Sequence, residues 1–228
     1  MTDRRIVIAG GHGKIARHLI KELTASGDRA VALIRNPDHV GPVRALGALP
    51  VVIDLETATV DEVADVVRGA DAVVFAAGAG PGSGADRKDS VDRGAAVLMA
   101  DAAERAGVRR FIQVSSFGAG EPIPDGTDEV FAAYLVAKTA AEDDLRRRDG
   151  LDWTILRPGG LTDDDPTGEV TLTEPPLERG TVPRGDVAAV IAALLASDGD
   201  GRPPRAVRRT LMLTEGSFSI EDALAALP

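Results

Sequence analysis

The stretch IVIAGGHGKIA, residues 6–16, joins a short apolar run to an amphipathic segment through three glycines. The apolar run is typical of a buried parallel strand, and the apolar spacing of KIARHLIKEL after it is typical of a helix. Gly10, Gly11 and Gly13 permit a tight turn between the two. Because the free amides and the dipole at the start of a helix attract a pyrophosphate, we expect a dinucleotide-binding turn here.

The other residues of this turn are predicted to serve the same site. Ala16 stands where the helix packs closely against the strand, and Lys14 and Ile15 begin the helix. His12 is interpreted as a neighbour of the phosphates or as a surface residue, not as a catalyst. The alternative for the whole stretch is a glycine-rich connection in an α/β protein that binds no nucleotide.

The composition is that of an ordinary globular chain, with 228 residues, 44% apolar and 27% charged, and no cysteine. These values argue against a disordered chain, and the length suits one domain with one active site. The absence of cysteine excludes disulfides, thiolate zinc sites and a cysteine nucleophile. We therefore expect a single NAD(P)-binding domain over residues 1–228.

The charge and the start of the chain limit the partners that we expect. A net charge of −10 opposes binding to nucleic-acid phosphates, which needs clustered cations. The basic run Arg146, Arg147 and Arg148 is interpreted as the end of a helix, where cations complement the dipole. The opening MTDRR does not resemble a secretory signal, and no apolar run is long enough to cross a membrane. We expect a cytoplasmic protein with no nucleic-acid or membrane partner.

Apolar clusters alternate along the chain with segments of helical spacing, in the order βαβαβαβαβαβ. This alternation predicts an α/β fold of the Rossmann type, a doubly wound parallel sheet with helices on both faces. The predicted strands are residues 4–9, 29–34, 50–53, 71–75, 109–114, 152–157 and 208–213. The predicted helices are residues 14–26, 38–47, 59–68, 89–107, 131–148, 185–197 and 219–227. Thr59 with Glu62 has the spacing of a capping box, and Ser219 is a predicted cap of the last helix.

Three segments rich in glycine, proline and aspartate follow the fourth, fifth and sixth predicted strands. They are residues 78–88, 117–128 and 158–184. Open α/β sheets bind ligands at the carboxyl ends of their strands, so we expect these segments to build the site. Residues 158–184 and 200–228 are expected to contribute a small substrate lobe over the cofactor.

Arg35 indicates which dinucleotide is bound. It follows the second predicted strand, at the distance where an NAD-specific protein places Asp or Glu for the adenosine ribose. A guanidinium can grip a 2′-phosphate, and we expect no acidic residue beside it to repel that phosphate. The sequence therefore favours NADP over NAD. The alternative is a solvent-exposed arginine at the end of a strand.

Residues after the third and fourth predicted strands complete the adenosine half of the expected site. Asp54 is placed to accept a hydrogen bond from the adenine amino group, with Leu55 against the ring; Asp54 could instead begin the next helix. The small residues Ala76, Ala77 and Gly78 would let the backbone pass close to the cofactor ribose.

The motifs GGHGKIA, RNP, DLE, FAAG, VSS, YLVAK and LRPGGLT occur in the order found in atypical short-chain dehydrogenases/reductases. Over essentially its whole length the chain resembles the NAD(P)H-binding subgroup of that family. This subgroup is similar to flavin and biliverdin reductases and to NmrA-like dinucleotide sensors, and such sequences are often labelled NAD-dependent epimerases/dehydratases. The resemblance implies a Rossmann fold, a preference for NADP and one small-molecule substrate.

Tyr134 and Lys138 match the Tyr-x-x-x-Lys motif of that family and lie four residues apart, on one face of a predicted helix. The resemblance implies that Lys138 binds the nicotinamide ribose and favours the phenolate. Tyr134 would then protonate the carbonyl oxygen that accepts hydride. The alternative is a buried tyrosine next to a surface lysine.

Three further residues receive catalytic roles from the same resemblance. Ser116, or Ser115 before it, would orient the substrate carbonyl or lie beside the nicotinamide as part of the cofactor site; alternatively both hydroxyls only close the turn after the strand. Asp92 occupies the place of the family's active-site asparagine, with Asp89 as the competing candidate. An ionised aspartate only accepts hydrogen bonds, so a water relay from Lys138 would need another arrangement.

The segment after the sixth predicted strand is expected to reach the nicotinamide. There the resemblance places the backbone of Pro158, Gly159 and Gly160 next to the carboxamide. The run Asp163–Asp165 is interpreted as a solvated loop, not as a metal site, because the three histidines have no metal-ligand spacing.

These residues predict an NADPH-dependent reductase of a small carbonyl, quinone or flavin-like acceptor. Two alternatives stay open: a binding module that senses NADP(H) without turnover, and an epimerase or dehydratase of a nucleotide-sugar. The sequence does not distinguish a monomer from a dimer.

Overall fold

The computed structural model describes residues 3–80, 82–196 and 204–227. Within them the main sheet has nine strands in the order β11-β8-β10-β6-β5-β4-β1-β2-β3. Neighbours from β3 to β10 are parallel, β8 is antiparallel to β10, and β11 is antiparallel to β8. The strands are β1 (Arg5–Ala9), β2 (Arg29–Ile34), β3 (Leu49–Val52), β4 (Ala72–Phe75), β5 (Arg110–Val114), β6 (Asp152–Pro158), β8 (Glu169–Thr173), β10 (Arg209–Glu215) and β11 (Phe218–Ser219).

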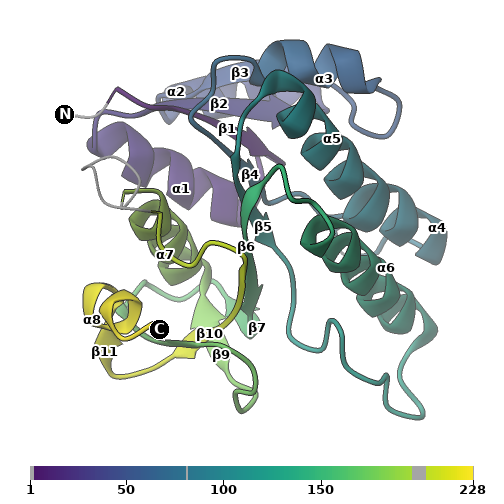
Figure 1. The fold of residues 1–228 in the computed structure, drawn as a ribbon, viewed down its shortest axis with the longest axis vertical. Helices are drawn as coiled ribbons and strands as arrows, with labels where there is room; N and C mark the ends of the chain where they lie inside the picture. Colours follow the sequence, from purple (N-terminus) through teal and green to yellow (C-terminus); the bar gives the residue numbers. More distant parts are fainter. Residues whose placement is uncertain (1–2, 81, 197–203, 228) are drawn as a thin grey trace.

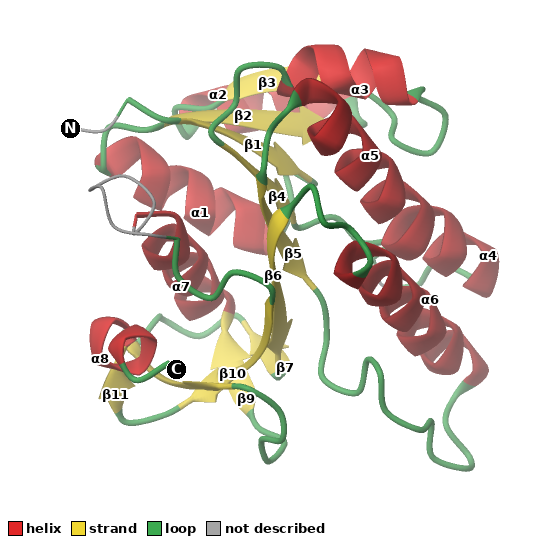
Figure 2. Ribbon diagram, in the orientation of Figure 1, coloured by secondary structure: helices red, strands yellow, loops and turns green. Residues whose placement is uncertain are grey.

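Helices cover both faces of this sheet, as Figures 1 and 2 show. One face carries α1 (Lys14–Ala25), α2 (Val40–Ala45), α7 (Arg184–Ala196) and α8 (Ile220–Ala225). The other carries α3 (Val60–Val67), α5 (Ala96–Ala106) and α6 (Glu129–Arg146). This is the Rossmann-like arrangement predicted from the alternation of strands and helices, and the prediction is confirmed.

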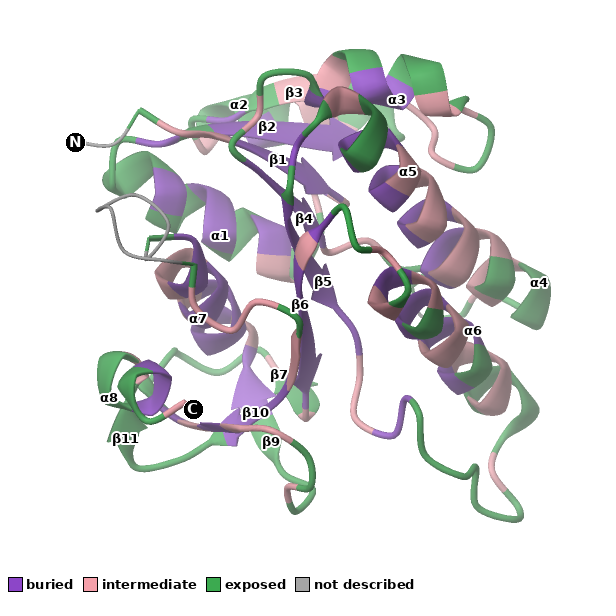
Figure 3. Cartoon of the chain, viewed as in Figure 1, coloured by how far each residue is buried: buried purple, intermediate pink, exposed green. Residues whose placement is uncertain are grey.

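The core consists of two apolar layers separated by the sheet. Along β1, Ile6 and Ile8 pack into the layer beneath α1 and α7, whereas Val7 and Ala9 pack into the layer beneath α3 and α5. Successive side chains of a strand point to opposite faces, so a strand between two helical layers must be apolar throughout. Figure 3 shows that the central strands of the sheet are buried, whereas the edge strands β3 and β11 are more exposed.

The predicted N-caps of two helices are confirmed. The Thr59 side chain accepts a hydrogen bond from the Glu62 amide, and the Glu62 carboxylate accepts one from the Thr59 amide, which completes the predicted capping box of α3. Ser219 caps α8 by accepting from the Asp222 amide. The predicted helix 38–47 is divided into a 3₁₀ turn, η1 (Pro37–His39), and α2.

Two segments differ from the sequence prediction. The predicted helix 89–107 consists of a π-helical stretch, η2 (Lys88–Ala95), followed by α5, and a short helix, α4 (Ala85–Arg87), precedes it within the predicted loop 78–88. Apolar spacing does not distinguish the wider turn of a π-helix from an α-helix, and such turns occur often at functional sites. Residues 158–184 contain β8 and a two-stranded parallel sheet of β7 (Gly160–Thr162) and β9 (Thr181–Pro183).

Parts of three predicted segments lie outside the described residues. These parts are residue 81 of the predicted loop 78–88, residue 197 at the end of the predicted helix 185–197, and residues 200–203 and 228 of the predicted lobe. No helix among the described residues is long and apolar enough to span a membrane.

Candidate functional site

The predicted cofactor residues lie at the edge of the sheet where the parallel strands end. β1 stands between β2 and β4, so the connections leaving β1 and β4 turn to opposite faces of the sheet and open a crevice between them. Gly10 follows β1, Arg35 follows β2, Asp54 follows β3 and Ala76 follows β4. The fold thus brings together four segments that are far apart in the sequence.

The glycine turn is too tightly packed for larger residues. A Cβ on Gly10, whose φ is +77°, would lie 2.7 Å from Ala77 Cα, and one on Gly11 would lie 2.5 Å from Ala32 Cβ. Gly13 is the N-cap of α1 and has no side chain to bond the first free amides of that helix. These amides therefore stay available at a backbone that a ligand can approach closely, which fits a pyrophosphate.

A cavity of about 310 Å³ adjoins this turn, and we call it the nucleotide cavity. Seven of the predicted cofactor residues besides the turn glycines line it: His12, Arg35, Asp54, Leu55, Ala76, Ala77 and Gly78. Leu33, Ile34, Ile53, Val91 and Ala95 add apolar surface that suits a flat adenine ring.

The side chains of two predicted cofactor residues, Lys14 and Ile15, do not line the nucleotide cavity. The Lys14 ammonium forms an ion pair with Asp163, whose carboxylate also lies 2.7 Å from Arg184 Nη1. The two cations lower the pKa of Asp163, the hydrogen bond from Lys14 being the largest cause. Ile15 packs against the apolar layer beneath α1. Their side chains therefore support the lobe and the core, and only their backbone adjoins the turn.

His12 lines the nucleotide cavity as half of a stacked pair. Its ring lies on that of His39, with centroids 3.6 Å apart and an angle of 14° between the planes. Partial burial, followed by the nearby charges of His39 and Arg17, lowers the pKa of His12. A neutral imidazole at this position is suited to packing next to a nucleotide and not to binding a phosphate by charge.

The structure places an acidic residue beside Arg35, contrary to the expectation from the sequence. Glu56 Oε2 lies 2.8 Å from Arg35 Nη1 and 3.1 Å from Arg87 Nη2. Glu56 is twenty-one residues from Arg35 and meets it because β2 and β3 are adjacent in the sheet. Glu56 belongs to the DLE motif, but its sequence context indicates no role for it, and no local pattern singles out Arg87.

Lys138 is buried on α6 and paired with Asp92. Lys138 Nζ lies 3.2 Å from Asp92 Oδ1 and donates a hydrogen bond to the Val114 carbonyl at 3.2 Å. The other carboxylate oxygen of Asp92 accepts from the Ala79 amide, and the side chains of Asp92 and Lys138 are 1% and 5% exposed. Of the two candidates in this helix, Asp92 therefore faces Lys138, whereas the exposed Asp89 pairs with Arg93.

Tyr134 is half-buried one turn before Lys138, whose Nζ lies 5.7 Å from the centre of the phenol ring. The ring stacks on Phe131 at 5.8 Å, and Lys88 Nζ lies 5.5 Å from its centre. A cavity of about 500 Å³ borders this group and is called the acceptor cavity below. Its lining residues are Gly82, Ser83, Gly84, Lys88, Asp128, Val130, Phe131 and Tyr134.

The two predicted serines have different surroundings. Ser115 is buried, and its hydroxyl donates to Glu142 Oε1 at 2.6 Å. Ser116 is half-buried, and its hydroxyl contacts the Phe117 carbonyl. Ser115 thus takes part in the packing of α6 against the end of β5, while Ser116 is more exposed to solvent.

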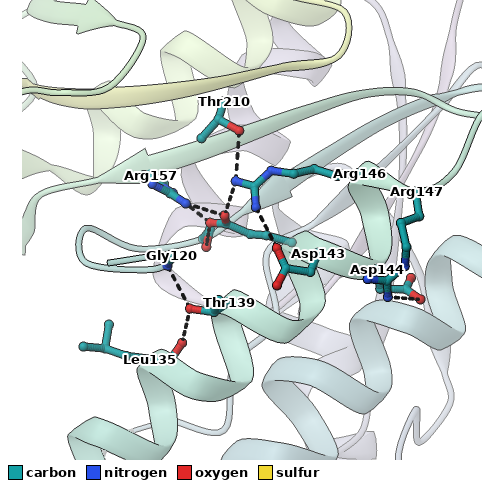
Figure 4. Close-up of polar contacts among 11 residues, drawn as sticks. Gly120, Leu135, Thr139, Asp143, Asp144, Arg146, Arg147, Arg157 and Thr210 are labelled. Carbon is teal, nitrogen blue, oxygen red and sulfur yellow. Dashed lines mark hydrogen bonds and ion pairs between the residues drawn. The ribbon is translucent and has the colours of Figure 1, made fainter. Parts of the chain in front are cut away.

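Glu142 is the centre of a buried polar network that the sequence did not indicate. Its carboxylate is fully buried, accepts two hydrogen bonds from Arg157 at 2.9 and 2.6 Å, and accepts one from Arg146 at 2.6 Å. Figure 4 shows this group together with the Thr139 hydroxyl, which accepts from the Gly120 amide. Its residues come from α6, β6 and the segment after β5, so no local pattern reveals it.

The basic run at the end of α6 has the predicted helix-terminal position. Arg146 pairs with Glu142 and Asp143, and Arg148 pairs with acidic residues of α5 and α6. Burial lowers the pKa of the Arg148 guanidinium, but the hydrogen bonds and charges of Asp144 and Asp101 together outweigh it and raise the pKa.

The last predicted segment leads from β6 into the lobe. Pro158 is the buried end of β6, and a Cβ on Gly159 would collide with the Gly180 carbonyl. The Gly160 amide donates to that same carbonyl at 2.8 Å. Gly159 must therefore be small where the chain contacts the lobe, and the contact of this segment with the nicotinamide stays a prediction.

The doubly wound sheet, the glycine turn at its switch point and the cavity beside it define a nicotinamide-dinucleotide-binding Rossmann protein. The chain belongs to the NAD(P)H-binding family, whose model matches residues 10–198.

Similar proteins have been described as epimerases and as reductases. A Bacillus subtilis protein named "Uncharacterized sugar epimerase YhfK" is 34% identical, covering 98% of this chain and 100% of the relative. A solved Bacillus halodurans structure, provisionally described as an NAD-dependent epimerase/dehydratase, is 37% identical with a TM-score of 0.86, covering 97% and 99% of the two chains. ChuY of Escherichia coli O157:H7, described as an anaerobillin reductase, is 26% identical with a TM-score of 0.73, covering 94% and 98%.

Proposed function

We propose that this chain is an NADPH-dependent reductase that transfers hydride to a small carbonyl, quinone or flavin-like acceptor. The observation that carries the proposal is the position of Tyr134 and Lys138 on successive turns of α6, next to the end of β5 and to the acceptor cavity. A phenol beside a buried ammonium is suited to protonating an oxygen that gains negative charge. The similarity to an anaerobillin reductase supports a reduction.

The cofactor supplies the hydride when it is bound, and the nucleotide cavity would hold its adenosine half. The free amides at the start of α1 would bind the pyrophosphate. Arg35 would bind the 2′-phosphate, which is the basis for proposing NADPH. Asp54 would accept a hydrogen bond from the adenine amino group, and Ala76 and Ala77 leave room for the ribose.

In the proposed reaction Tyr134 gives its phenolic proton to the acceptor oxygen. The Lys138 ammonium stabilises the phenolate that remains, and Asp92 holds that ammonium in place and offsets the cost of burying it. The acceptor would lie in the acceptor cavity against the exposed ring of Phe131. Val114 and Ser115, at the end of β5, set the position of α6 through hydrogen bonds with Lys138 and Glu142.

One observation favours a second candidate, a sensor that binds NADP(H) without turnover. Asp92 and the Val114 carbonyl take two of the three N–H donors of the Lys138 ammonium, which leaves at most one for the Tyr134 hydroxyl. A sensor needs the nucleotide cavity but no proton donor. The third reading, a sugar epimerase, has its support in the name of the Bacillus subtilis relative.

Replacing Tyr134 with Phe tests the proposal. We expect kcat for NADPH oxidation with a responsive quinone, flavin or aldehyde to fall by about 10²–10⁴-fold, because the general acid is lost. The Kd for NADPH should stay unchanged, as should both values in the control variant Val136→Ala, which alters an exposed residue of the same helix.

Three outcomes would contradict the reductase. If the wild-type protein binds NADPH but consumes none with the whole acceptor panel, the sensor is favoured. If Tyr134→Phe retains full activity, Tyr134 is not the acid. Turnover of nucleoside-diphosphate sugars by the wild type would favour the epimerase.

A further inference from the structure

Two arginines from different elements meet on one carboxylate oxygen at the edge of the nucleotide cavity. Glu56 Oε2 lies 2.8 Å from Arg35 Nη1, which follows β2, and 3.1 Å from Arg87 Nη2, which ends α4. Arg87 Nε also points at this oxygen, at 3.4 Å. All three residues line the nucleotide cavity. An oxyanion thus already occupies the space between the two guanidinium groups.

The surroundings hold this group in position and keep it charged. The Ser90 hydroxyl donates to the second oxygen of Glu56 at 2.7 Å, and Arg87 Nη1 donates to the Ala79 carbonyl at 3.2 Å. The pKa of Glu56 is lowered, first by the Ser90 hydrogen bond and then by Arg87 and Arg35, against the opposing effect of burial. At neutral pH the cluster therefore has two positive charges and one negative charge.

We propose that Glu56 occupies the place of the cofactor's 2′-phosphate in the free protein, and that Arg87 is a second ligand of that phosphate beside Arg35. The inference rests on the proposed use of NADPH and adds the residues that select it. Arg35 alone was expected from its position after a strand, whereas Arg87 reaches the site from a segment fifty-two residues later.

The 2′-phosphate should bind the two arginines more strongly than the Glu56 carboxylate does, because it has more negative charge and more acceptor oxygens. A phosphate monoester carries about −1.5 to −2 charges near neutral pH and has three acceptor oxygens, against a single negative charge on Glu56. Two guanidinium groups can each present two N–H donors to such a group. Glu56, with a side chain 23% exposed, lies close enough to solvent to turn away when the phosphate arrives.

Glu56 then affects the two nucleotides unequally. NADPH must break the bonds from Arg35 and Arg87 to Glu56, so the carboxylate lowers the affinity for NADPH. The 2′-hydroxyl of NADH has no charge to compete for the guanidinium groups, and it leaves those bonds intact. Removing the charge of Glu56 should therefore strengthen the binding of 2′-phosphorylated nucleotides only.

Binding of two cofactor fragments by isothermal titration calorimetry tests the inference without any turnover. The probes are adenosine 2′,5′-bisphosphate and adenosine 5′-monophosphate, which differ only in the 2′-phosphate. For Arg87→Ala we expect about tenfold to hundredfold weaker binding of the bisphosphate, the value of one lost charge-assisted contact. Binding of the monophosphate should change by less than about twofold. For E56Q we expect tighter binding of the bisphosphate alone.

Arg93→Ala is the matched control, because Arg93 belongs to η2 but pairs with Asp89 and does not line the nucleotide cavity. It should bind both probes like the wild type. Unfolding curves of each variant show whether it is folded, and Arg87→Lys supplies a second variant that keeps the charge but not the planar fork.

The outcomes separate this inference from the proposed function. If the wild type binds both fragments equally, the preference for NADP fails and the inference fails with it. If the wild type prefers the bisphosphate and Arg87→Ala retains that preference, the inference alone is overturned. If E56Q selectively weakens binding of the bisphosphate, the inference is also overturned, because Glu56 would then position the two arginines to bind the phosphate instead of competing with it. The absence of reductase activity would not affect any of these results.

Discussion

The two halves of the candidate site depend on different kinds of contact. The cofactor half, around Gly10 and the ends of β1 to β4, is made of backbone and small residues that a sheet edge brings together. The catalytic half, around Tyr134 and Lys138, is made of long side chains whose positions depend on buried ionic contacts. Backbone geometry follows from local sequence, whereas buried charges need partners from distant elements. The glycine turn of the cofactor half could therefore be predicted from local sequence, whereas in the catalytic half the sequence indicated the residues and the fold decided their ion pairs.

The largest expected effect is in the catalytic half. Glu142→Ala should lower the free energy of unfolding by about 3–5 kcal/mol, because it leaves the buried Arg157 without its charge partner. Urea denaturation measures the change. Asp143→Ala is the control: Asp143 is exposed and pairs only at the surface of α6, so it should cost less than about 1 kcal/mol. Equal effects of the two substitutions would mean that the buried network does not hold this half together.

A middle-sized effect is expected in the cofactor half. Gly10→Ala and Gly69→Ala both place a side chain at positive φ, +77° and +74°, but only the Cβ at residue 10 meets other atoms. The free energy of unfolding should therefore fall by about 1–3 kcal/mol more for Gly10→Ala, the usual cost of overpacking. Gly10→Ala should also weaken NADPH binding, measured by fluorescence titration, while Gly69→Ala should not. If the two variants are alike, the close approach of the turn to Ala77 is unimportant.

The smallest effect on the free energy of unfolding is expected at Glu56, a charged residue of the cofactor half. The folded-state pKa of Glu56 is lowered, so its contribution to stability is complete above its ordinary pKa and is lost as the pH falls through the folded value. In the free protein E56Q should cost at most about 1 kcal/mol at neutral pH, as partly exposed ion pairs do. The difference from wild type should disappear in acid. Unfolding curves across pH measure it, and a difference that grows in acid would contradict this assignment.

Much of the fold was predictable because its signals are local. The Thr59 capping box, the cap at Ser219 and the strand–glycine–helix turn each depend on residues within a few positions of one another. The π-helical stretch η2 was predicted as ordinary helix, because its wider turn leaves the apolar spacing nearly unchanged. The strands within residues 158–184 are short and pair with partners far along the chain, so that segment resembled a loop.

The sequence by itself determined the parallel sheet, the glycine turn and the identity of the residues after each strand, because alternation, spacing and glycine content are properties of neighbouring residues. Only the tertiary structure decided which side chains meet there. It brought Arg35 and Arg87 together on Glu56, Asp92 next to Lys138 and Glu142 next to Ser115. The physical reason is that an ion pair depends on distances of a few ångströms in space, and those distances are set by sheet order and helix packing.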